Sequence, residues 1–545
     1  MPNDHGEFDV SPTESETTGT AGNFPHGSRE TPETSALAGA DRSEKARCRN
    51  PDMHVSGESD SSIVPEKQAN QGSVPLPAES VEGRGLTKEN ARPSLLDRTQ
   101  RRAPRSRGLS GVREAARRDR TMRFNNLLHH VTPELLRSSF FDLKKQAAPG
   151  IDGETWAQYA EDFAARIDDL HERVHRGTYR AQPSKRAWTP KPDGTLRPLG
   201  IAALEDKLVQ HAVATVLGCI YEEDFQGFSY GFRPGRGCQR ALDALYMGIQ
   251  TRKVNWILDA DIRGFFDNID HTWLMKFLEH RIADRRLLRL LKKWLRAGVS
   301  EDGQWSPSTV GTPQGAVISP LYSNVFLHYV LDLWMGAWRK RHAQGEVVIV
   351  RYADDFVIGF REESDAKRCL IALQERFAKF GLELHPEKTR LIEFGRYATE
   401  RRSKRGDGPP ETFDFLGFTH ISGKTRKGAF AIHRISSGKK LRNKLREIKE
   451  KLRRKMHQDL AQVGAWLSSV FRGWCQYHAL PGNSIRMQQF RTALQRLWLR
   501  ALRRRSQRGR RMTWLEFSRL SKRWLPTPKI LHEYPDARFR RLYPR

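Results

Sequence analysis

Residues 351–360 read RYADDFVIGF, and residues 346–350 before them read EVVIV. Two runs rich in β-branched residues therefore meet at Ala353-Asp354-Asp355. This is the pattern of a β-hairpin, although the usual Asn-Gly or Asp-Gly turn is absent. The pattern predicts that Asp354 and Asp355 lie at or near the hairpin tip. Each of two adjacent carboxylates raises the cost of ionising the other, so the pair is expected to need a compensating cation.

A second predicted strand supplies another carboxylate. Residues 254–270 read VNWILDADIRGFFDNID, and their alternation defines two faces. One face carries Trp256, Leu258, Ala260 and Ile262, and the other carries Ile257, Asp259 and Asp261. A neighbouring hairpin tip would place Asp354 and Asp355 beside Asp261. Three convergent carboxylates suit Mg²⁺, and two such ions about 4 Å apart support phosphoryl transfer. Taken alone, an Asp-Asp pair more often marks solvated loop carboxylates.

The net charge indicates a polyanionic partner. The 545 residues carry a formal charge of +30, which is typical of nucleic-acid-binding proteins, and their number predicts more than one domain. Residues 1–92 differ, because they hold 16 acidic and 9 basic side chains and few aromatic residues. They are predicted to form a disordered acidic leader.

Cysteine usage and hydropathy bear on the compartment. The 5 cysteines include no CxxC pair, which favours a reducing compartment and argues against a zinc module. The sequence has neither a signal peptide at its N-terminus nor a run of about 18 apolar residues. We therefore expect a cytoplasmic protein that does not span a membrane.

Residues 439–545 are the main candidate for RNA contact, with 29 basic and 6 acidic side chains. An apolar stripe through residues 439–457 indicates an amphipathic basic helix, and it consists of Leu441, Leu445, Ile448, Leu452 and Met456. The strongest phosphate-binding candidates lie in RALRRRSQRGRR (residues 500–511) and are Arg500, Arg503, Arg504, Arg505 and Arg508. Most of the aromatic residues interleaved with these arginines are expected in the core.

Several motifs together resemble one family. DIRGFF (261–266), TPQGAVISP (312–320), YADD (352–355), GLELHPEKT (381–389) and FDFLGF (413–418) occur in the order of the reverse transcriptase palm. AAPGIDG (147–153), PKPDGTLRPLGIAALEDKLVQ (190–210) and SYGFRPGRGC (229–238) resemble the finger blocks of group II intron-encoded reverse transcriptases. FRGWCQYH (471–478) and the basic helices resemble that family's maturase or thumb domain. The resemblance covers roughly residues 110–545.

The resemblance implies an α+β fold, the right-hand polymerase with fingers, palm and thumb. The implied domains are a leader at 1–92, an N-terminal extension and fingers at 93–253, the palm at 254–437, and a helical thumb or maturase domain at 438–545. The implied activity is RNA-directed DNA synthesis.

The resemblance also assigns the metal ligands. It makes Asp261, Asp354 and Asp355 the ligands of two Mg²⁺ ions, with a further contact from the carbonyl of Ile262. Asp259 shares the predicted face of Asp261, but the family pattern matches Asp261, so Asp259 is expected to be structural.

Further positions match residues that contact the nucleotide. Phe266 matches the bulky residue that stands against the 2′ carbon and favours dNTPs over NTPs. Gln314 matches a residue lining the nucleotide pocket, and Lys191 and Arg197 match residues that hold the triphosphate. Lys388 matches a candidate general acid for the leaving pyrophosphate. Without the family, Phe266 would be read as a core residue and Lys191 and Arg197 as solvated charges of a surface turn.

The implied partners are intron RNA bound as a splicing maturase, an RNA template, a DNA primer and dNTPs. Relatives often carry an endonuclease with paired cysteines, and because Cys475 is the last cysteine here, no endonuclease is expected. One alternative is a non-catalytic RNA-binding splicing factor, against which the intact Asp261, Asp354 and Asp355 argue. Another is a domesticated reverse transcriptase in phage defence. An RNA-dependent RNA polymerase is disfavoured by Phe266.

Overall fold

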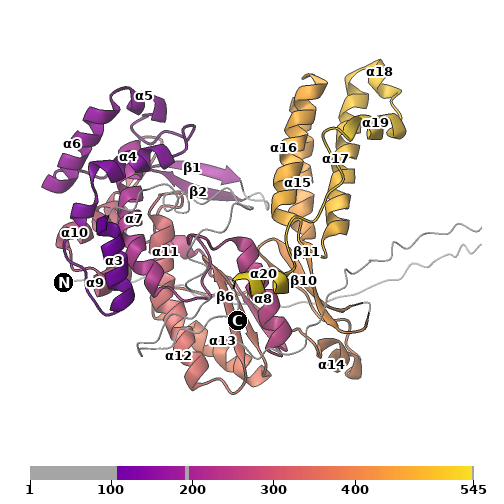
Figure 1. Cartoon of the computed structure of the whole chain (residues 1–545), viewed down its shortest axis with the longest axis horizontal. Helices are drawn as coiled ribbons and strands as arrows, with labels where there is room; N and C mark the ends of the chain where they lie inside the picture. The colour runs from indigo at the N-terminus through magenta and orange to yellow at the C-terminus, as the bar shows by residue number, and fades with distance from the viewer. Residues whose placement is uncertain (1–106, 191–194, 426, 543–545) are drawn as a thin grey trace, which may run out of the picture. The chain divides into compact units, whose positions relative to one another are not determined.

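The computed structural model describes residues 107–190, 195–425 and 427–542 (Figure 1). The leader predicted at residues 1–92 lies outside the described residues, and so does Lys191. The described chain has a mixed α/β structure with three sheets, whose strand orders are β2-β1-β4-β5, β6-β7-β3-β8 and β11-β10-β9. The expected combination of helices and sheets in one chain is confirmed.

A group of helices precedes the first sheet. It comprises α3 (Arg107–Arg118), η1 (Leu128–His130), α4 (Pro133–Asp142), α5 (Trp156–Glu161), α6 (Phe163–Arg176) and, after two strands, α7 (Leu204–Asp224). The hydroxyl of Thr132 caps α4 ahead of Pro133, and Thr155 forms a capping box with Gln158 at the start of α5. Helix α7 is buried on nearly every side because its apolar residues are not confined to one stripe.

The first sheet consists of β1 (Ser184–Pro190), β2 (Leu196–Ile201), β4 (Val299–Glu301) and β5 (Gln304–Ser306). Strands β1 and β2 pair antiparallel, and β1 pairs in parallel with β4. This register sets Arg197 opposite Thr189, next to residues 191–194, which the structure does not describe.

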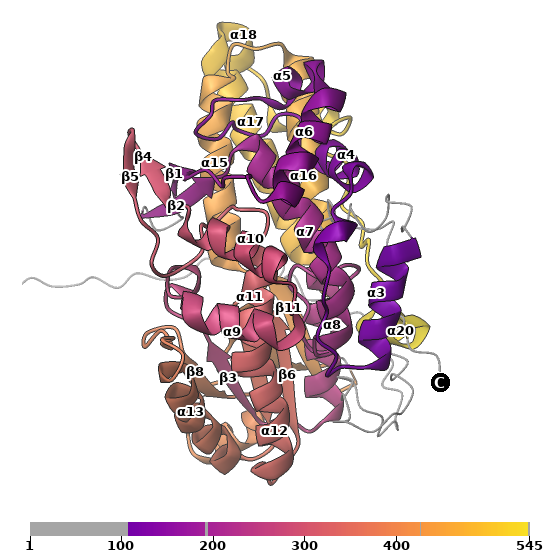
Figure 2. The same cartoon turned by 90° about the vertical axis from the view of Figure 1, so that its left-hand side faces the viewer.

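The central antiparallel sheet contains the predicted hairpin and consists of β6 (Val347–Tyr352), β7 (Asp355–Phe360), β3 (Trp256–Ala260) and β8 (Arg390–Glu393). Helices α8 (Cys238–Thr251) and α13 (Glu363–Ala378) pack against it. Both Ile257 and Leu258 on β3 are fully buried, and they lie on the two opposite faces that the alternation predicts, so both faces of the sheet are covered. The intervening elements are η2 (Phe265–Asp267), α9 (His271–Arg281), α10 (Arg285–Arg296), α11 (Ser319–Leu327), η3 (His328–Asp332) and α12 (Leu333–Arg341), and Figure 2 shows α12 and α13 beside the sheet.

A small sheet and a helix bundle follow. After α14 (Ala398–Lys404), the sheet is formed by β9 (Phe413–Phe415), β10 (Phe418–Lys424) and β11 (Phe430–Ser436). The helices are α15 (Gly438–Arg454), α16 (Leu460–His478), α17 (Ser484–Arg505), α18 (Gln507–Arg510), α19 (Trp514–Ser521) and α20 (Pro535–Leu542). The bundle has an apolar core of its own, to which α15 contributes Leu441, Ile448 and Leu452. The predicted stripe is thus confirmed through Leu452, whereas Met456 lies beyond the end of α15.

The last helix returns to the central sheet. Helix α20 packs on α8, where the buried Asp243 accepts from Arg434 of β11 at 2.9 Å and pairs with Arg538 of α20 at 3.2 Å. One carboxylate therefore connects three separate parts of the chain. Within the described ranges, no helix has a stretch long and apolar enough to cross a bilayer.

Candidate active site

The predicted hairpin is confirmed, with the aspartate pair at its tip. Tyr352 pairs with Asp355 across the two strands, so Ala353 and Asp354 form a two-residue turn. Ala353 has a φ of 58°, in the left-handed region that costs a residue with a Cβ about 1–2 kcal/mol. A glycine would adopt this conformation without that cost, so the surrounding structure must hold Ala353 in place. Arg351 contributes to this support.

Arg351 is fully buried beneath the tip, and each of its five N–H donors has an acceptor. The Nε and Nη2 atoms donate to the two carboxylate oxygens of Asp332 at 2.7 and 2.5 Å. Nη1 donates to the carbonyl of Ala353 at 2.9 Å. Asp332 is also fully buried and ends η3, a π-helical turn between α11 and α12. The guanidinium group thus ties the turn carbonyl to a helix of the core.

The segment SYGFRPGRGC (229–238) also contacts the hairpin tip. Nη2 of Arg351 donates to Ser229 at 2.7 Å, and Tyr230 N donates to the Arg351 carbonyl at 2.8 Å. A Cβ on Gly231 would lie 2.1 Å from the amide nitrogen of Ala353, so only glycine allows this approach. Asn324 connects the two by donating to the Gly231 carbonyl at 2.8 Å and accepting from Arg351 at 3.1 Å.

Asp261 lies one residue beyond the end of β3, whose last residue, Ala260, pairs with Phe356 on β7. It is therefore beside Asp355, as predicted. Its carbonyl accepts from His385 N at 2.8 Å, and its Oδ2 accepts from Lys388 Nζ at 2.7 Å. Ile262 is buried and forms a bridge with Leu384. The GLELHPEKT motif therefore positions both Asp261 and the candidate general acid.

The carboxylates disturb one another electrostatically. Burial, and then the charges of Asp354 and Asp261, raise the pKa of Asp355 to about 6, although its side chain reaches solvent. Burial and the charge of Asp261 also raise the pKa of Asp354, against the lowering effects of Arg197 and Arg351. Hard oxygen donors that repel one another in this way suit divalent cations. As the side chains stand, no three Asp, Glu, His or Cys side chains in the described ranges converge closely enough to hold a metal ion.

Asp259 has a different partner. Its carboxylate pairs with Arg390 at 3.3 Å, and Arg390 also donates to the carbonyl of Thr412 at 3.4 Å. Burial raises the pKa of Asp259, while the bond from Arg390 lowers it. This pairing agrees with the expected structural role.

Backbone contacts connect the segments that carry Phe266, Gln314 and Arg197, three of the residues expected at the nucleotide. The Gln314 carbonyl accepts from Gly200 N on β2 at 2.7 Å, and Thr312 N donates to the Phe266 carbonyl at 2.8 Å. Gly315 has a φ of 109°, and a Cβ there would lie 3.0 Å from the Gly200 carbonyl oxygen. The TPQGA loop therefore joins β2 to η2. Arg197 is exposed on β2 near enough to lower the pKa of Asp354, and the side chain of Phe266 is half-buried.

Lys440 was not predicted as a site residue. It lies in the first turn of α15 and lowers the pKa of Asp355, and a Cβ on Gly417 would lie 3.2 Å from its Nζ atom. Arg351 and Asp332 were also missed as supports of the tip. Arg351 adjoins the YADD motif, which was a usable signal, whereas Asp332 and Lys440 become neighbours only through folding.

Four of the five predicted RNA-binding arginines are exposed at the end of α17, and two of these four also have partners within the chain. Arg503 donates to the Met512 carbonyl at 3.0 and 2.7 Å, and Arg505 donates to the Gln458 carbonyl at 2.8 Å. Arg500 and Arg504 are exposed, and the side chain of Arg508 is outside the described part. Among the interleaved aromatic residues, Trp498 is buried and Trp514 is 41% exposed.

Comparison with known proteins agrees with this site. The family model described as Reverse transcriptase (RNA-dependent DNA polymerase) matches residues 189–420. Protein YkfC of Escherichia coli K12 is 31% identical over 334 residues, which cover 53% of this chain and 87% of YkfC. The group II intron-encoded protein LtrA of Lactococcus lactis is 36% identical over 202 residues, 36% of this chain and 33% of LtrA. The uncharacterized 91 kDa protein in the cob intron of Schizosaccharomyces pombe is 25% identical over 58% of this chain and 46% of that protein. The alignments thus span less than half the length of the two intron-encoded relatives.

Proposed function

The chain belongs to the group II intron type of reverse transcriptase, and we propose that it adds dNTPs to a primer 3′-hydroxyl on an RNA template at Asp261, Asp354 and Asp355. One observation supports this proposal above the others. The hairpin tip and the end of β3 bring three carboxylates together, and the charge of Asp261 contributes to raising the pKa values of Asp354 and Asp355. A fold that needed Asp354 and Asp355 only for stability would pair them with cations, as it pairs Asp259 with Arg390.

We propose that the three aspartates hold two Mg²⁺ ions, with the carbonyl of Ile262 as a further ligand. When bound, the ions would activate the attacking hydroxyl and neutralise charge on the transferred phosphate. The side chains of Asp354 and Asp355 supply oxygen ligands from a fixed turn. Asp261 must exchange its contact with Lys388 for the cation, since one of its oxygens is taken by that side chain.

The surrounding residues then position the nucleotide. Arg197, together with Lys191, would bind the triphosphate, and Gln314 would line the pocket. Phe266 would exclude a 2′-hydroxyl by its bulk. Released from Asp261, the ammonium group of Lys388 would give a proton to the oxygen of the leaving pyrophosphate, so that an N–H bond breaks as an O–H bond forms.

The domain assignment also remains a proposal. The central sheet would belong to the palm at 254–437, the preceding helices with β1 and β2 to the fingers at 93–253, and the bundle to the thumb at 438–545. Strands β4 and β5 belong to the same sheet as β1 and β2 but fall within the palm range. The separate apolar core of the bundle supports the last boundary. Helix α8 falls in the finger range but packs on β6, so by its contacts it belongs with the palm.

We further propose that intron RNA is the second partner, that binding assists splicing and intron mobility, and that the protein acts in the cytoplasm. Support comes from the excess of basic side chains after residue 438 and from the similarity to LtrA, a group II intron-encoded protein. A non-catalytic splicing factor fits less well, because the strained hairpin tip and its buried supports are retained.

Primer extension on an RNA template with Mg²⁺ and dNTPs tests the proposal. We expect Asp354→Asn to lower the rate by about 10³-fold or more, since the metal ions stabilise the transition state by several kcal/mol. The matched control is Asp407→Asn, which removes the same charge from an exposed aspartate whose partner is Arg405. Equal product from wild type and Asp354→Asn would refute the assignment.

A further inference from the structure

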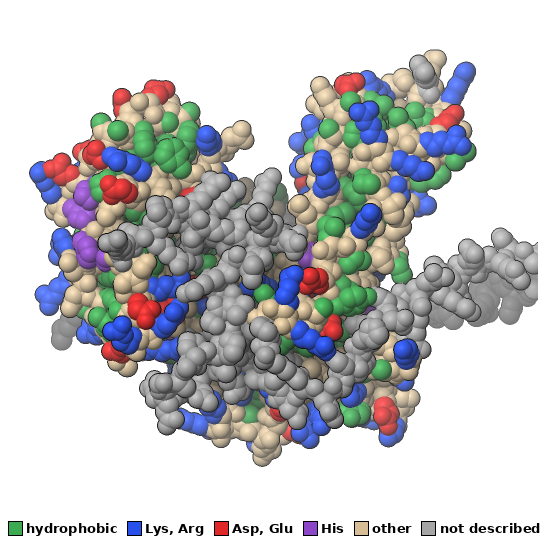
Figure 3. All heavy atoms as spheres, viewed as in Figure 1, with side chains coloured by type: hydrophobic (Ala, Val, Ile, Leu, Met, Phe, Trp, Pro, Cys, Tyr) green, Lys and Arg blue, Asp and Glu red, His purple; other side chains and the backbone are tan. Residues whose placement is uncertain are grey.

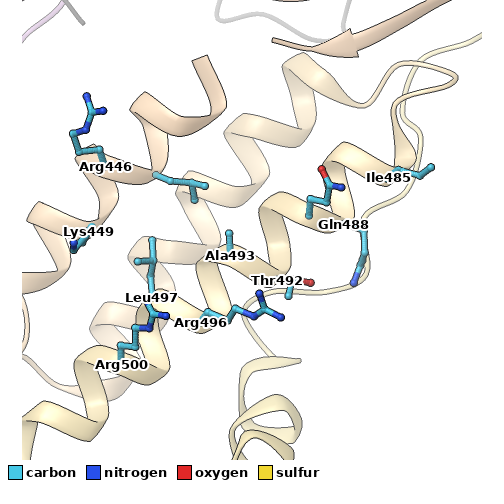
Figure 4. Close-up of a pocket in the computed structure, with 11 residues that line it drawn as sticks. Arg446, Lys449, Ile485, Gln488, Thr492, Ala493, Arg496, Leu497 and Arg500 are labelled. Carbon is cyan, nitrogen blue, oxygen red and sulfur yellow. The ribbon is translucent and has the colours of Figure 1, made fainter. Parts of the chain in front are cut away.

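A groove runs between α15 and α17 on the helix bundle (Figure 4). Its volume is about 870 Å³, within the range of sites that enclose small molecules. Arg446 and Lys449 of α15 line one side, and Arg496 and Arg500 of α17 line the other. Figure 3 shows Lys and Arg side chains among hydrophobic ones over this bundle.

The charges of the groove are not compensated by the protein. None of its lining residues is acidic. Within the described chain, none of Arg446, Lys449, Arg496 and Arg500 forms an ion pair, whereas the nearby Glu447 is bound by two lysines on its own helix. Four unpaired cations around one depression favour an anionic ligand.

The floor of the groove is apolar and includes Ala493 and Leu497. Contact with phosphates alone requires no apolar floor. An unpaired nucleobase does require one, because at least one face of its ring is removed from water when it binds. Bases of unpaired RNA are commonly stacked on apolar or guanidinium surfaces. Arg496 and Arg500 are one helical turn apart, about 6 Å along the axis, so they can contact neighbouring phosphates of one strand.

The groove and Lys440 lie on different sides of α15. Lys440 lies close enough to the hairpin to lower the pKa of Asp355, so its side of α15 faces the active site. At about 100° per residue, Lys449 lies roughly 180° around the helix from Lys440, and Arg446 lies roughly 240° around it. RNA in the groove would therefore lie on a different side of α15 from a primer terminus at Asp355.

We propose that the α15–α17 groove binds an unpaired segment of structured RNA at a site separate from the catalytic carboxylates. The bases lie on the apolar floor, and the phosphates contact the basic rim. This inference rests on the proposed RNA partner and specifies which feature of that RNA the bundle recognises.

Binding of two RNAs tests it, a hairpin with an unpaired loop and a blunt duplex of the same length. Ala493→Trp fills the floor without changing charge, and Arg496→Gln with Arg500→Gln removes charge from the exposed rim. We expect each variant to lose roughly tenfold of its affinity for the hairpin loop relative to the duplex. The control, Arg503→Gln with Arg504→Gln, removes the same charge from α17 outside the groove and should weaken both RNAs alike.

Three outcomes would overturn the inference. The first is an unchanged preference for the loop in both groove variants, with thermal unfolding showing that they are folded. The second is a loss of primer extension by Ala493→Trp in parallel with its loss of RNA affinity, which would assign the groove to the template and primer. The third is an equal loss of loop preference in the control. If wild type binds neither RNA, the proposed RNA partner fails, which is a distinguishable result.

Discussion

The hairpin tip and the α15–α17 groove carry charge in opposite ways. Under the tip, every N–H donor of the fully buried Arg351 has an acceptor, and Asp332 accepts from its Nε and Nη2 atoms. At the groove, four cations line an open depression without an ion pair. Charges that hold a reacting group must be fixed before the substrate arrives, because a small displacement there costs rate. Charges that attract a large ligand are most effective when no side chain of the protein forms an ion pair with them.

The largest effect should come from breaking the pair beneath the tip. Removal of one partner leaves a buried charge unpaired, so we expect Asp332→Ala or Arg351→Ala to lower the free energy of unfolding by about 3–5 kcal/mol. The double variant Arg351→Met with Asp332→Leu replaces both charges by apolar groups and should recover most of that loss. Urea unfolding measures both changes.

Activity separates support of the tip from general stability. In the folded double variant, the carbonyl of Ala353 and the hydroxyl of Ser229 lose their donor, so primer extension should stay low although stability returns. Full activity of the double variant would show that Arg351 only stabilises the fold. As a groove control, Arg496→Ala should change the unfolding free energy by no more than about 0.5 kcal/mol.

Phe266 gives the next largest effect, and it sharpens the contrast because its role is steric. Its carbonyl holds the TPQGA loop through Thr312, and this bond survives truncation of the ring. We expect Phe266→Ala to reduce the preference for dNTPs over NTPs by roughly 10–100-fold, with Phe266→Leu in between. Single-nucleotide incorporation measures the ratio. An unchanged ratio in Phe266→Ala would mean that Phe266 serves only as a core residue, packed against Phe265.

Sequence reasoning succeeded at the hairpin because adjacent residues determine it. Two apolar runs around Asp354 and Asp355 allow only one register, and Tyr352 pairs with Asp355 as that register requires. The amphipathic stripe of α15 was similarly local.

What sequence could not supply depends on distant parts of the chain. Asp332, which pairs with Arg351, is the last residue of a π-helical turn between two α-helices, and no residue pattern predicted that turn. The groove arises from the spacing of two helices, so its lining residues looked like an ordinary solvated basic face. The pairing of Lys388 with Asp261 likewise needed the contact between the GLELHPEKT segment and the end of β3.

A pH dependence should distinguish the two regions. The pKa of Asp355 is raised to about 6, so the metal-free protein gains stability from its protonated form and loses that gain as pH rises through 6. Mg²⁺ needs the ionised form, so its apparent affinity should rise about tenfold per unit up to pH 6 and then level off. Calorimetric Mg²⁺ titration from pH 5 to 8 measures this effect.

The matched variant and the groove provide the controls for this titration. Asp355→Asn should bind Mg²⁺ weakly and show a flatter pH profile. The groove has no histidine or carboxylate among its lining residues, so RNA affinity should change little over the same range. A Mg²⁺ affinity independent of pH below 6 would contradict the electrostatic account of the tip.

The smallest effect is expected from single arginines at the end of α17. Arg504 is exposed, whereas Arg503 already donates twice to the carbonyl of Met512. If each phosphate contact releases one counterion, Arg504→Gln should reduce the slope of log affinity against log salt by about 0.7–0.9, and Arg503→Gln should reduce it less. Filter binding of one structured RNA across a salt series measures the slopes. Equal slopes for wild type and Arg504→Gln would exclude Arg504 from the interface, whereas a larger change in Arg503→Gln would mean that RNA displaces the bond to Met512. In either case, a bond within the chain would not decide which arginines of this helix contact RNA.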